Sequence, residues 1–441
     1  MRVYKALPEC GRAFFSCHDV CRVYLVLCIS IRRTLIEIYI YFIHGIEDPF
    51  EVDMLDFERK SIVMVTCPKG FSPYLAEEIE RLGFDVREIL PAGVEVKASL
   101  NECMRLNLWV RCGHRVMYQL KRFKAETPDQ MYTEVKDMVW ERIIAPDGYL
   151  TVTSSVHTET VNDSRFANVK VKDAIVDRIR EKLGRRPSSG PDMSGIIVFL
   201  HWRDDECTIY LDTSGVPLAR RGYRKFPHKA PLQETLAATL IRSAKWYGRG
   251  NFVSPMCGSG TLAIEAALIA LNGAPGLMRE SYAFMQLPGY NPEYWDNLCI
   301  DAEDREKSSI DGKIIATDLD PEAVEAARKN ARAAGVEHHI QFEVCDFRET
   351  EIPKGSGIVI MNPEYGERLG CRTKLEKIYS AIGDFFKNKC QGYRGFVFTG
   401  NMELAKFIGL KSSSRTFFYN AKIECRLLEY EIFQGSNKRR Y

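Results

Sequence analysis

The run Asn251–Ala267, NFVSPMCGSGTLAIEAA, decides the fold of the C-terminal half of the chain. It starts with Asn251-Phe252-Val253, a short segment whose apolar residues are typical of a buried parallel strand. The strand leads into the glycine turn Gly258-Ser259-Gly260, and an apolar helical segment starts directly after it. Such a turn lets the backbone approach a ligand closely, and the helix N-terminus supplies free N–H groups. The stretch predicts a nucleotide-binding strand–turn–helix unit, although a glycine pair alone also fits a simple tight turn.

Three further apolar segments follow, and each leads to a polar residue. Lys313–Ala316 leads to Asp318, Ile340–Val344 to Asp346, and Ile358–Met361 to Asn362. In a doubly wound sheet, ligands bind at the carboxyl ends of the strands, so we expect these side chains near the glycine turn. Asp318 lies roughly 55–60 residues beyond the turn, where about 20 is usual for a ribose-binding acid. Each acid alone also fits a helix cap or a surface residue.

The extra residues between the turn and Asp318 form an insertion, 273–311, rich in Pro, Gly and aromatic residues. This composition predicts a long functional loop. Beyond it, Asp320-Pro321-Glu322 has the cap, proline and acid of a helix start, and Gly335 marks the helix end.

These motifs resemble those of class I S-adenosylmethionine-dependent methyltransferases. Ser254–Thr261 is similar to their first motif, and Asn362-Pro363-Glu364-Tyr365 to their amino-group-methylating motif, usually Asn-Pro-Pro-Tyr. The segments SGVPLARRGYR, 214–224, and APLQETLAATL, 230–240, resemble the joint of the THUMP-containing RNA guanine-N2 methyltransferases. Within that family the resemblance is strongest to the bacterial enzymes of 23S ribosomal RNA. It covers the chain from about Ile62 to the C-terminus.

The resemblance implies S-adenosylmethionine as the cofactor, held by the backbone of the glycine turn, by Asp318 at the ribose and by Asp346 with Phe347 at the adenine. The cofactor-binding residues are then Pro255, Cys257, Gly258, Gly260, Thr261, Asp318, Asp346 and Phe347. Cys257 is expected to be a small buried residue and not a nucleophile.

The same resemblance assigns the chemistry to the motif after the fourth strand. Asn362 and the carbonyl of Pro363 would accept the two protons of a guanine amine, and Tyr365 would stack on the extruded base. An Asn-Pro-x-Tyr sequence alone also fits an ordinary strand-end turn.

Two positions depart from the family pattern. Ser254 stands where an acid is usual, and its loss could weaken contact with the ammonium group of the cofactor. Glu364 stands where the second proline is usual, and its carboxylate could lie outside the site or make the site more negative. Because of these departures, an RNA-binding ribosome assembly factor without catalytic activity remains an alternative.

The predicted fold class is α/β, with a doubly wound, Rossmann-like methyltransferase domain of mostly parallel strands and an antiparallel final strand. The strand–helix–strand–strand–helix pattern from Ile62 to Leu108 indicates a ferredoxin-like α+β unit before it. By resemblance, a THUMP domain lies between the two. The predicted division is an N-terminal extension, 1–53, then 54–120, 121–214, a basic linker, 215–230, and the methyltransferase domain, 231–441. We hypothesise that Met54 is the natural start.

Two basic segments are candidates for contact with RNA, because cations neutralise phosphates and aromatic rings stack on bases. Between residues 164 and 190, eight Lys or Arg accompany three acids, which also fits a solvated helix face. Between Asp212 and Glu234 every charge is basic, a run that repels itself unless an anion is near. The candidates are Lys170, Lys172, Arg185 and Arg186 in the first segment, and Arg220, Arg221, Tyr223, Arg224, Lys225 and Lys229 in the second.

Composition bounds the remaining choices. A net charge of only +2 over 441 residues means that affinity for RNA must come from local patches. Fourteen cysteines without a CxxC pair indicate reduced thiols in a cytoplasmic protein and no zinc site. The apolar run Val23–Ile31 is shorter than the ~20 residues of a membrane span, so no membrane partner is expected.

The leading prediction is methylation of the guanosine N2 amine in 23S ribosomal RNA. The alternatives are the same reaction on transfer RNA and the assembly factor named above. A DNA adenine-N6 methyltransferase shares the Asn-Pro-x-Tyr motif, but the N-terminal half argues against it.

Overall fold

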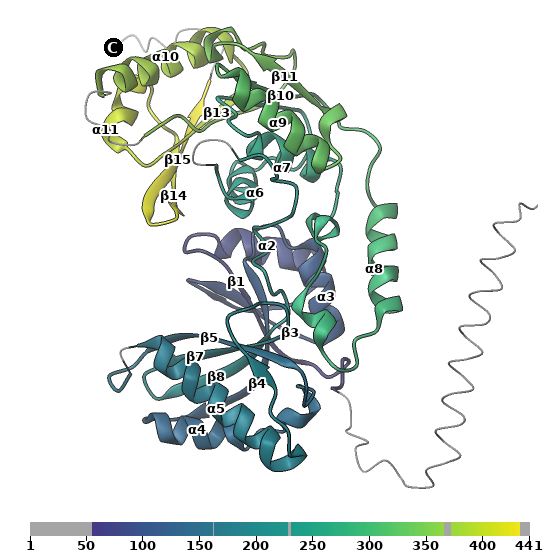
Figure 1. Ribbon diagram of the computed structural model, residues 1–441. Coiled ribbons are helices and arrows are strands. Elements are labelled where there is room, and N and C mark those ends of the chain that lie inside the picture. Colours follow the sequence, from purple (N-terminus) through teal and green to yellow (C-terminus); the bar gives the residue numbers. More distant parts are fainter. Residues whose placement is uncertain (1–54, 162, 228–230, 366–371, 433–441) are drawn as a thin grey trace, which may run out of the picture. The chain divides into compact units, whose positions relative to one another are not determined.

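The computed structural model describes residues 55–161, 163–227, 231–365 and 372–432 (Figure 1). The predictions for residues 1–53 and for Lys229 lie outside these ranges.

The first half of the described chain forms one eight-stranded sheet with the order β2-β3-β1-β4-β8-β7-β5-β6. The strands are β1 (Ser61–Thr66), β2 (Val86–Leu90), β3 (Gly93–Ala98), β4 (Arg115–Lys124), β5 (Tyr149–His157), β6 (Ser188–Ser189), β7 (Ile196–Arg203) and β8 (Glu206–Asp212). β4 pairs with β1 on one side and with β8 on the other, so it belongs to both the ferredoxin-like and the THUMP part. The predicted boundary at residue 120 therefore falls inside a strand of a continuous sheet.

Helices of this half start and end at recognisable signals. They are α2 (Ser72–Arg81), α3 (Leu100–Trp109), α4 (Pro128–Lys136), η1 (Trp140–Arg142) and α5 (Ser164–Leu183). The side chain of Ser99 accepts from the backbone of Glu102, whose side chain accepts from Ser99 in turn, which is a capping box. α5 ends at Gly184, which adopts the left-handed conformation that favours glycine (φ 67°).

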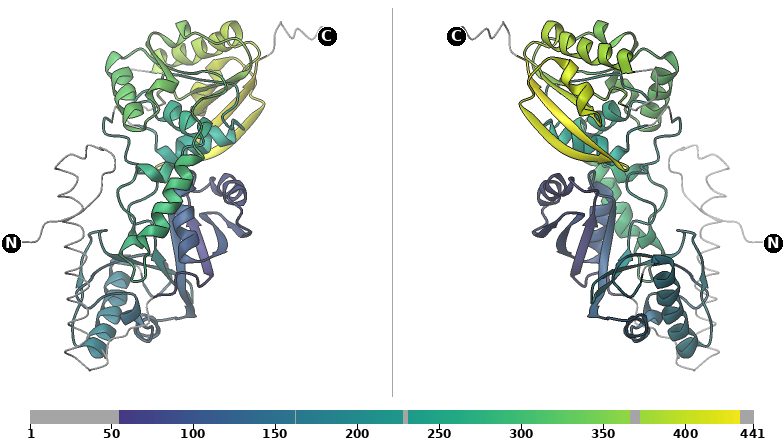
Figure 2. Two further views of the ribbon diagram at one scale, coloured as in Figure 1. Left: turned by 90° about the vertical axis from the view of Figure 1, so that its right-hand side faces the viewer. Right: turned by 90° about the vertical axis from the view of Figure 1, so that its left-hand side faces the viewer.

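The second half forms a seven-stranded sheet with the order β11-β10-β9-β12-β13-β15-β14. Figure 2 shows its long C-terminal hairpin, β14 and β15, in yellow. Its strands are β9 (Asn251–Pro255), β10 (Ile314–Asp318), β11 (Ile340–Val344), β12 (Gly357–Met361), β13 (Arg394–Thr399), β14 (Ser414–Asn420) and β15 (Ile423–Glu431). The strands from β11 to β13 pair in parallel, and β15 pairs antiparallel with both β13 and β14. This confirms the predicted doubly wound fold with antiparallel strands at its end.

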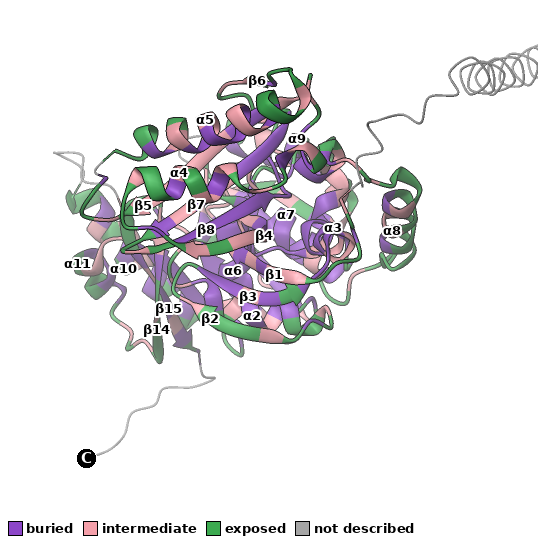
Figure 3. Cartoon of the chain, turned by 90° about the horizontal axis from the view of Figure 1, so that it is seen from below, coloured by how far each residue is buried: buried purple, intermediate pink, exposed green. Residues whose placement is uncertain are grey.

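Helices cover both faces of the second sheet because successive strand residues point to opposite sides. Phe252 of β9 joins the core that contains α7, and its neighbour Val253 joins the core under α10. The helices are α6 (Glu234–Ser243), α7 (Thr261–Ala270), α9 (Pro321–Ala333), η4 (Glu337–His339), η5 (Phe347–Glu349), α10 (Arg372–Lys389), α11 (Met402–Ala405) and η6 (Lys406–Ile408). Figure 3 shows α7 as almost wholly buried.

The prediction of a long loop over the insertion is wrong. The segment forms η2 (Pro275–Met278), η3 (Ala283–Gln286) and α8 (Pro292–Asp304), which begins at the side-chain cap Asn291. The rings of Tyr282 and Phe284 stack at 5.0 Å, and Trp295 packs 5.1 Å from Phe284. The aromatic residues that suggested a loop therefore form a small core, which also packs against α3.

Candidate cofactor and substrate site

The glycine turn between β9 and α7 is built from two glycines with different roles. Both adopt positive φ, 54° at Gly258 and 83° at Gly260. A Cβ at Gly260 would lie 2.8 Å from the Cβ of Ala327 on α9, so this position must be glycine for the two helices to pack. A Cβ at Gly258 would meet nothing within 4 Å. The turn thus leaves open space above Gly258.

Asp318 lies directly beside this turn, despite the insertion between them in the sequence. Its Oδ2 accepts a hydrogen bond from the Gly258 N–H at 2.9 Å, and its Oδ1 accepts from the Asp320 N–H at 3.0 Å. The Cys257 N–H donates to the Thr317 carbonyl at 2.9 Å, which ties the two strand ends together. A carboxylate offers about four acceptor positions, so Asp318 keeps capacity for further hydroxyl donors.

Among the cofactor candidates of the first motif, Pro255, Gly260 and Thr261 are buried, and Cys257 and Gly258 are partly buried. Pro255 ends β9 and Thr261 is the first residue of α7. Burial is the main cause that raises the pKa of the Cys257 thiol, with the Asp318 carboxylate adding to it. A thiol held neutral is a poor nucleophile, as the sequence predicts.

Asp346 and Phe347 follow β11, but their side chains are occupied. Both carboxylate oxygens of Asp346 accept from the Arg348 guanidinium, at 2.8 and 2.6 Å, and these hydrogen bonds lower the pKa of Asp346. The Phe347 ring is 9% exposed and packs edge-on against Phe385 at 5.8 Å. Phe347 therefore belongs to the hydrophobic core, and its contact with the adenine stays a prediction. The adenine role of Asp346 stays a prediction.

Leu319 is a residue that the sequence reasoning missed. It follows Asp318 directly and is 70% exposed, the largest exposed fraction among the large apolar side chains described. An uncovered leucine beside an acid at a strand end is suited to the apolar face of a ligand. The signal was an apolar residue between two acids, Asp318 and Asp320.

Asn362 follows β12, the strand next to β9 in the sheet. Its side-chain Oδ1 is buried and has no hydrogen-bond partner among the described residues. A buried acceptor without a donor costs about 1–3 kcal/mol, so such a group is expected where a ligand satisfies it. Pro363 is buried, whereas Glu364 is exposed, which agrees with the alternative that its carboxylate lies outside the site.

Tyr365 is held in place by the C-terminal hairpin. Asn420 Nδ2 donates to its hydroxyl at 2.8 Å, and Cys425 Sγ lies 3.7 Å from the same oxygen. Its ring packs perpendicular to Phe398 at 6.4 Å. Burial raises the pKa of Tyr365 to about 12. The ring is thus fixed and neutral, and its stacking on a base stays a prediction.

Ser254 is the second buried polar group without a partner in this region. The residue is 1% exposed, and its Oγ has no hydrogen-bond partner in the described chain. It occupies the strand position where the family usually has a carboxylate.

Part of the basic run after Asp212 is structural, which corrects three of the predicted RNA contacts. Arg221 and Tyr223 are each 1% exposed. Arg221 Nε lies 2.8 Å from Glu265 Oε1 on α7, and the Tyr223 hydroxyl donates to the same oxygen at 2.9 Å. Arg224 is mostly buried and pairs with Glu234 at 3.0 Å. The anions that balance Arg221 and Arg224 are carboxylates of the protein itself.

The remaining candidates stay at the surface. Arg220, Lys225, Arg185 and Arg186 are exposed. Lys170 pairs with Asp129 at 3.0 Å and Lys172 with Asp173 at 2.9 Å, which agrees with the alternative of a solvated helix face. Their contact with RNA stays a prediction.

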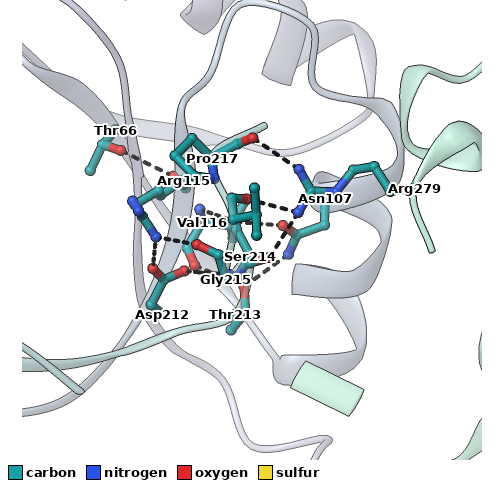
Figure 4. Close-up of polar contacts among 11 residues, drawn as sticks. Thr66, Asn107, Arg115, Val116, Asp212, Thr213, Ser214, Gly215, Pro217 and Arg279 are labelled. Atoms are coloured by element: carbon teal, nitrogen blue, oxygen red, sulfur yellow. Dashed lines mark hydrogen bonds and ion pairs between the residues drawn. The ribbon is translucent and has the colours of Figure 1, made fainter. Parts of the chain in front are cut away.

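The joint between the two sheets is a compact polar cluster (Figure 4). Asp212 accepts from the N–H groups of Ser214 and Gly215 at 2.9 and 3.1 Å and pairs with Arg115. Arg279, from the insertion, donates to four linker carbonyls, those of Ser214, Val216, Pro217 and Arg220. Residues 214–220 are therefore an ordered part of the connection between the two halves.

The comparisons with known proteins agree with this architecture. Residues 63–117 match the RlmL ferredoxin-like domain, residues 125–212 the THUMP domain, and residues 221–429 the RMKL-like methyltransferase domain. The chain is also 33% identical to a protein of Synechocystis sp. named "Putative RNA methyltransferase", over 83% of this chain and 96% of the relative. The chain belongs to this family of THUMP-containing methyltransferases. The domain boundaries of the sequence prediction remain proposals in their finer detail.

Two further relatives extend the comparison. The chain is 40% identical to the "Ribosomal RNA large subunit methyltransferase K/L" of Syntrophotalea carbinolica, over 83% of this chain and 53% of the relative. It thus spans about half the length of that relative. A crystal structure of SMU.472, "a putative methyltransferase complexed with SAH", superposes with a TM-score of 0.77 and 26% identity, covering 86% of this chain and all of the other.

In the described ranges no helix is both long and apolar enough to cross a bilayer. The same ranges contain no group of three or more His, Cys, Asp or Glu side chains placed to hold a metal ion.

Proposed function

We propose that this protein is a cytoplasmic, S-adenosylmethionine-dependent RNA methyltransferase that methylates the N2 amine of a guanosine in 23S ribosomal RNA. The observation that carries the proposal is the partnerless, buried Oδ1 of Asn362 at the end of β12. An exocyclic amine is a donor of the kind that this acceptor lacks. The name of the Syntrophotalea relative supports ribosomal over transfer RNA as the substrate.

The residues around the glycine turn fit the cofactor. The open space above Gly258 admits a ligand against the backbone, and the helix N-terminus of α7 lies next to it. Asp318 has acceptor capacity left for ribose hydroxyls, and Leu319 offers an apolar surface for the adenine. The Ser254 hydroxyl is free to bind the ammonium group, directly or through a water molecule. When bound, the cofactor supplies an electrophilic methyl group on a sulfonium.

The chain's own residues would prepare the nucleophile. The lone pair of the guanine amine is delocalised into the ring, so the amine must be held in the reactive geometry. Asn362 Oδ1 and the Pro363 carbonyl would accept its two N–H groups, and proline restricts the backbone that aims this carbonyl. The fixed ring of Tyr365 would stack on the extruded base.

The mechanism is tested by Asn362→Ala in a methyl-transfer assay at saturating RNA. We expect turnover to fall about a hundredfold or more, because the amine loses its positioning acceptor. Cofactor affinity, measured by calorimetry, should stay within about twofold. Asn168→Ala is the matched control, since its Oδ1 is also buried and partnerless but lies on α5. Wild-type turnover in Asn362→Ala would contradict the role, and loss of cofactor binding would show a structural effect instead.

A further inference from the structure

The C-terminal hairpin presents an exposed face on which aromatic rings are paired with cations. Arg415, Phe417 and Tyr419 share one face of β14, because alternate residues point the same way. The strand register places Arg426 of β15 opposite Phe417, and its guanidinium lies 4.4 Å from the centre of that ring. Phe417 is 53% exposed, so the hydrophobic core does not account for it.

Lys69, from the ferredoxin-like unit, extends this face. Its Nζ lies 5.7 Å from the centre of the Tyr419 ring. The loop that carries Lys69 is fixed against β14, since a Cβ at Gly70 would lie 2.9 Å from the Phe417 carbonyl oxygen. On the opposite face of β14, Phe71 packs edge-on against Phe418 at 5.8 Å. The loop that carries Lys69 is therefore held against β14 by Gly70 and by Phe71.

The charge of this hairpin face is positive. We define the face by Arg415, Phe417, Tyr419, Arg426 and Lys69, together with Lys422 at the hairpin turn and Glu424 on β15. Its only acid, Glu424, pairs with Arg426 at 3.0 Å. Lys69 and Lys422 are exposed and have no ion-pair partner among the described residues. Four cations and one acid give this face an excess positive charge that suits a polyanion.

The tip of the hairpin touches the catalytic motif. Asn420, next to Tyr419 in β14, donates to the Tyr365 hydroxyl at 2.8 Å. A Cβ at Gly400 would lie 2.9 Å from both Ile423 and the Tyr365 ring, so the hairpin turn and the tyrosine pack on the same glycine. Asn420 points to the face of β14 opposite Phe417 and Tyr419, so an RNA strand whose target base stacks on Tyr365 would reach the hairpin face around the tip, past Lys422.

We propose that the hairpin face binds the single-stranded RNA that flanks the target nucleotide. Phe417 and Tyr419 stack on flanking bases, while Lys69, Lys422 and Arg415 neutralise phosphates. This inference rests on the proposed function and assigns part of the RNA contact to the catalytic domain and the loop at Lys69, outside the THUMP unit.

The test measures the affinity of the full-length protein for a ten-nucleotide oligouridylate at several salt concentrations. Phe417→Ala should weaken binding roughly tenfold through the lost stacking. The double variant Lys69→Ala/Lys422→Ala should make the negative slope of log affinity against log salt less steep by ~1.4. Each phosphate contact on a single strand contributes ~0.7 to this steepness. Phe407→Ala, which removes a ring that is 43% exposed on η6, is the control and should bind as the wild type does.

Wild-type affinity and salt slope in both hairpin variants would overturn the inference. Methyl transfer to RNA by the wild-type protein separates this failure from that of the proposed function. If transfer occurs while the hairpin variants bind normally, only the hairpin inference fails. If the variants lose binding while no transfer occurs, the hairpin surface stands and the proposed function fails.

Discussion

Arg221→Met should destabilise the protein without changing how it binds RNA. Arg221 and Glu265 are 1% and 0% exposed, and the Arg221 guanidinium also donates to the Arg111 carbonyl at 3.0 Å. The substitution leaves the Glu265 carboxylate buried with the Tyr223 hydroxyl as its remaining partner. Breaking a buried pair in this way costs about 3–5 kcal/mol.

The free energy of unfolding is measured by urea titration with tryptophan fluorescence. At a denaturant dependence of about 3 kcal/mol per molar urea, this loss lowers the unfolding midpoint by about 1 M or more. Arg348→Met is the matched control, because the Arg348 side chain is 64% exposed and a surface pair contributes below about 1 kcal/mol.

A second variant separates the buried pair from general damage to the core. Arg221→Met/Glu265→Leu removes both charges, so it should recover much of the lost stability. A midpoint for Arg221→Met within about 0.3 M of the wild type would refute the structural role. A lower salt slope of RNA binding in the folded variant would restore Arg221 as an RNA contact.

Three further predictions concern the site and the basic surface. Gly258→Ala should reduce cofactor affinity in calorimetry, because its Cβ enters the open space, and should cost the fold only the ~1–2 kcal/mol of a left-handed alanine. Gly260→Ala should lower the unfolding midpoint further, because its Cβ also collides with Ala327. Equal effects of the two substitutions on affinity and stability would contradict the separate roles. Arg185→Ala/Arg186→Ala should make the negative slope of log RNA affinity against log salt less steep by ~1.4 to 1.8, and an unchanged slope would mean that these two arginines do not contact the RNA. Burial raises the pKa of Tyr365 from its ordinary value near 10 to about 12, so the stability gained by burying the neutral phenol is present below about pH 10 and is lost as the pH rises through about 12. The pH–rate profile between about pH 8 and 10 should therefore be the same in Tyr365→Phe as in the wild type, and a limb that disappears in the variant would contradict a neutral Tyr365.

The strands and the glycine turn were predictable because their signals are local. Phe252 and Val253 are apolar and the glycine turn follows five residues later, and the helix after Asp320 carries its cap and its proline within three residues. The insertion was not predictable in this way. The aromatic residues Tyr282, Phe284 and Trp295 stabilise this segment by packing on one another, and the segment packs on α3. These tertiary contacts have no local sequence signal.

The charges show the same limit. Between Asp212 and Glu234 every charged residue is basic, and the acid that pairs with Arg221, Glu265, lies on the helix that follows the next strand. Only the fold brings Arg221 and Glu265 together, so the sequence alone predicted a basic surface patch. The location of Asp318, in contrast, was predictable. It ends a parallel strand next to β9, and this predicted that it lies beside Gly258 despite the insertion.

We propose that this chain transfers a methyl group to the N2 amine of a guanosine in large-subunit ribosomal RNA. The most direct measurement incubates the protein with labelled S-adenosylmethionine and total RNA from a strain that lacks its gene, and then identifies the labelled nucleoside. We expect label in N2-methylguanosine from 23S ribosomal RNA, and about a hundredfold less or lower with Asn362→Ala. Label in no RNA, together with no binding of the cofactor, would contradict it and favour an RNA-binding assembly factor.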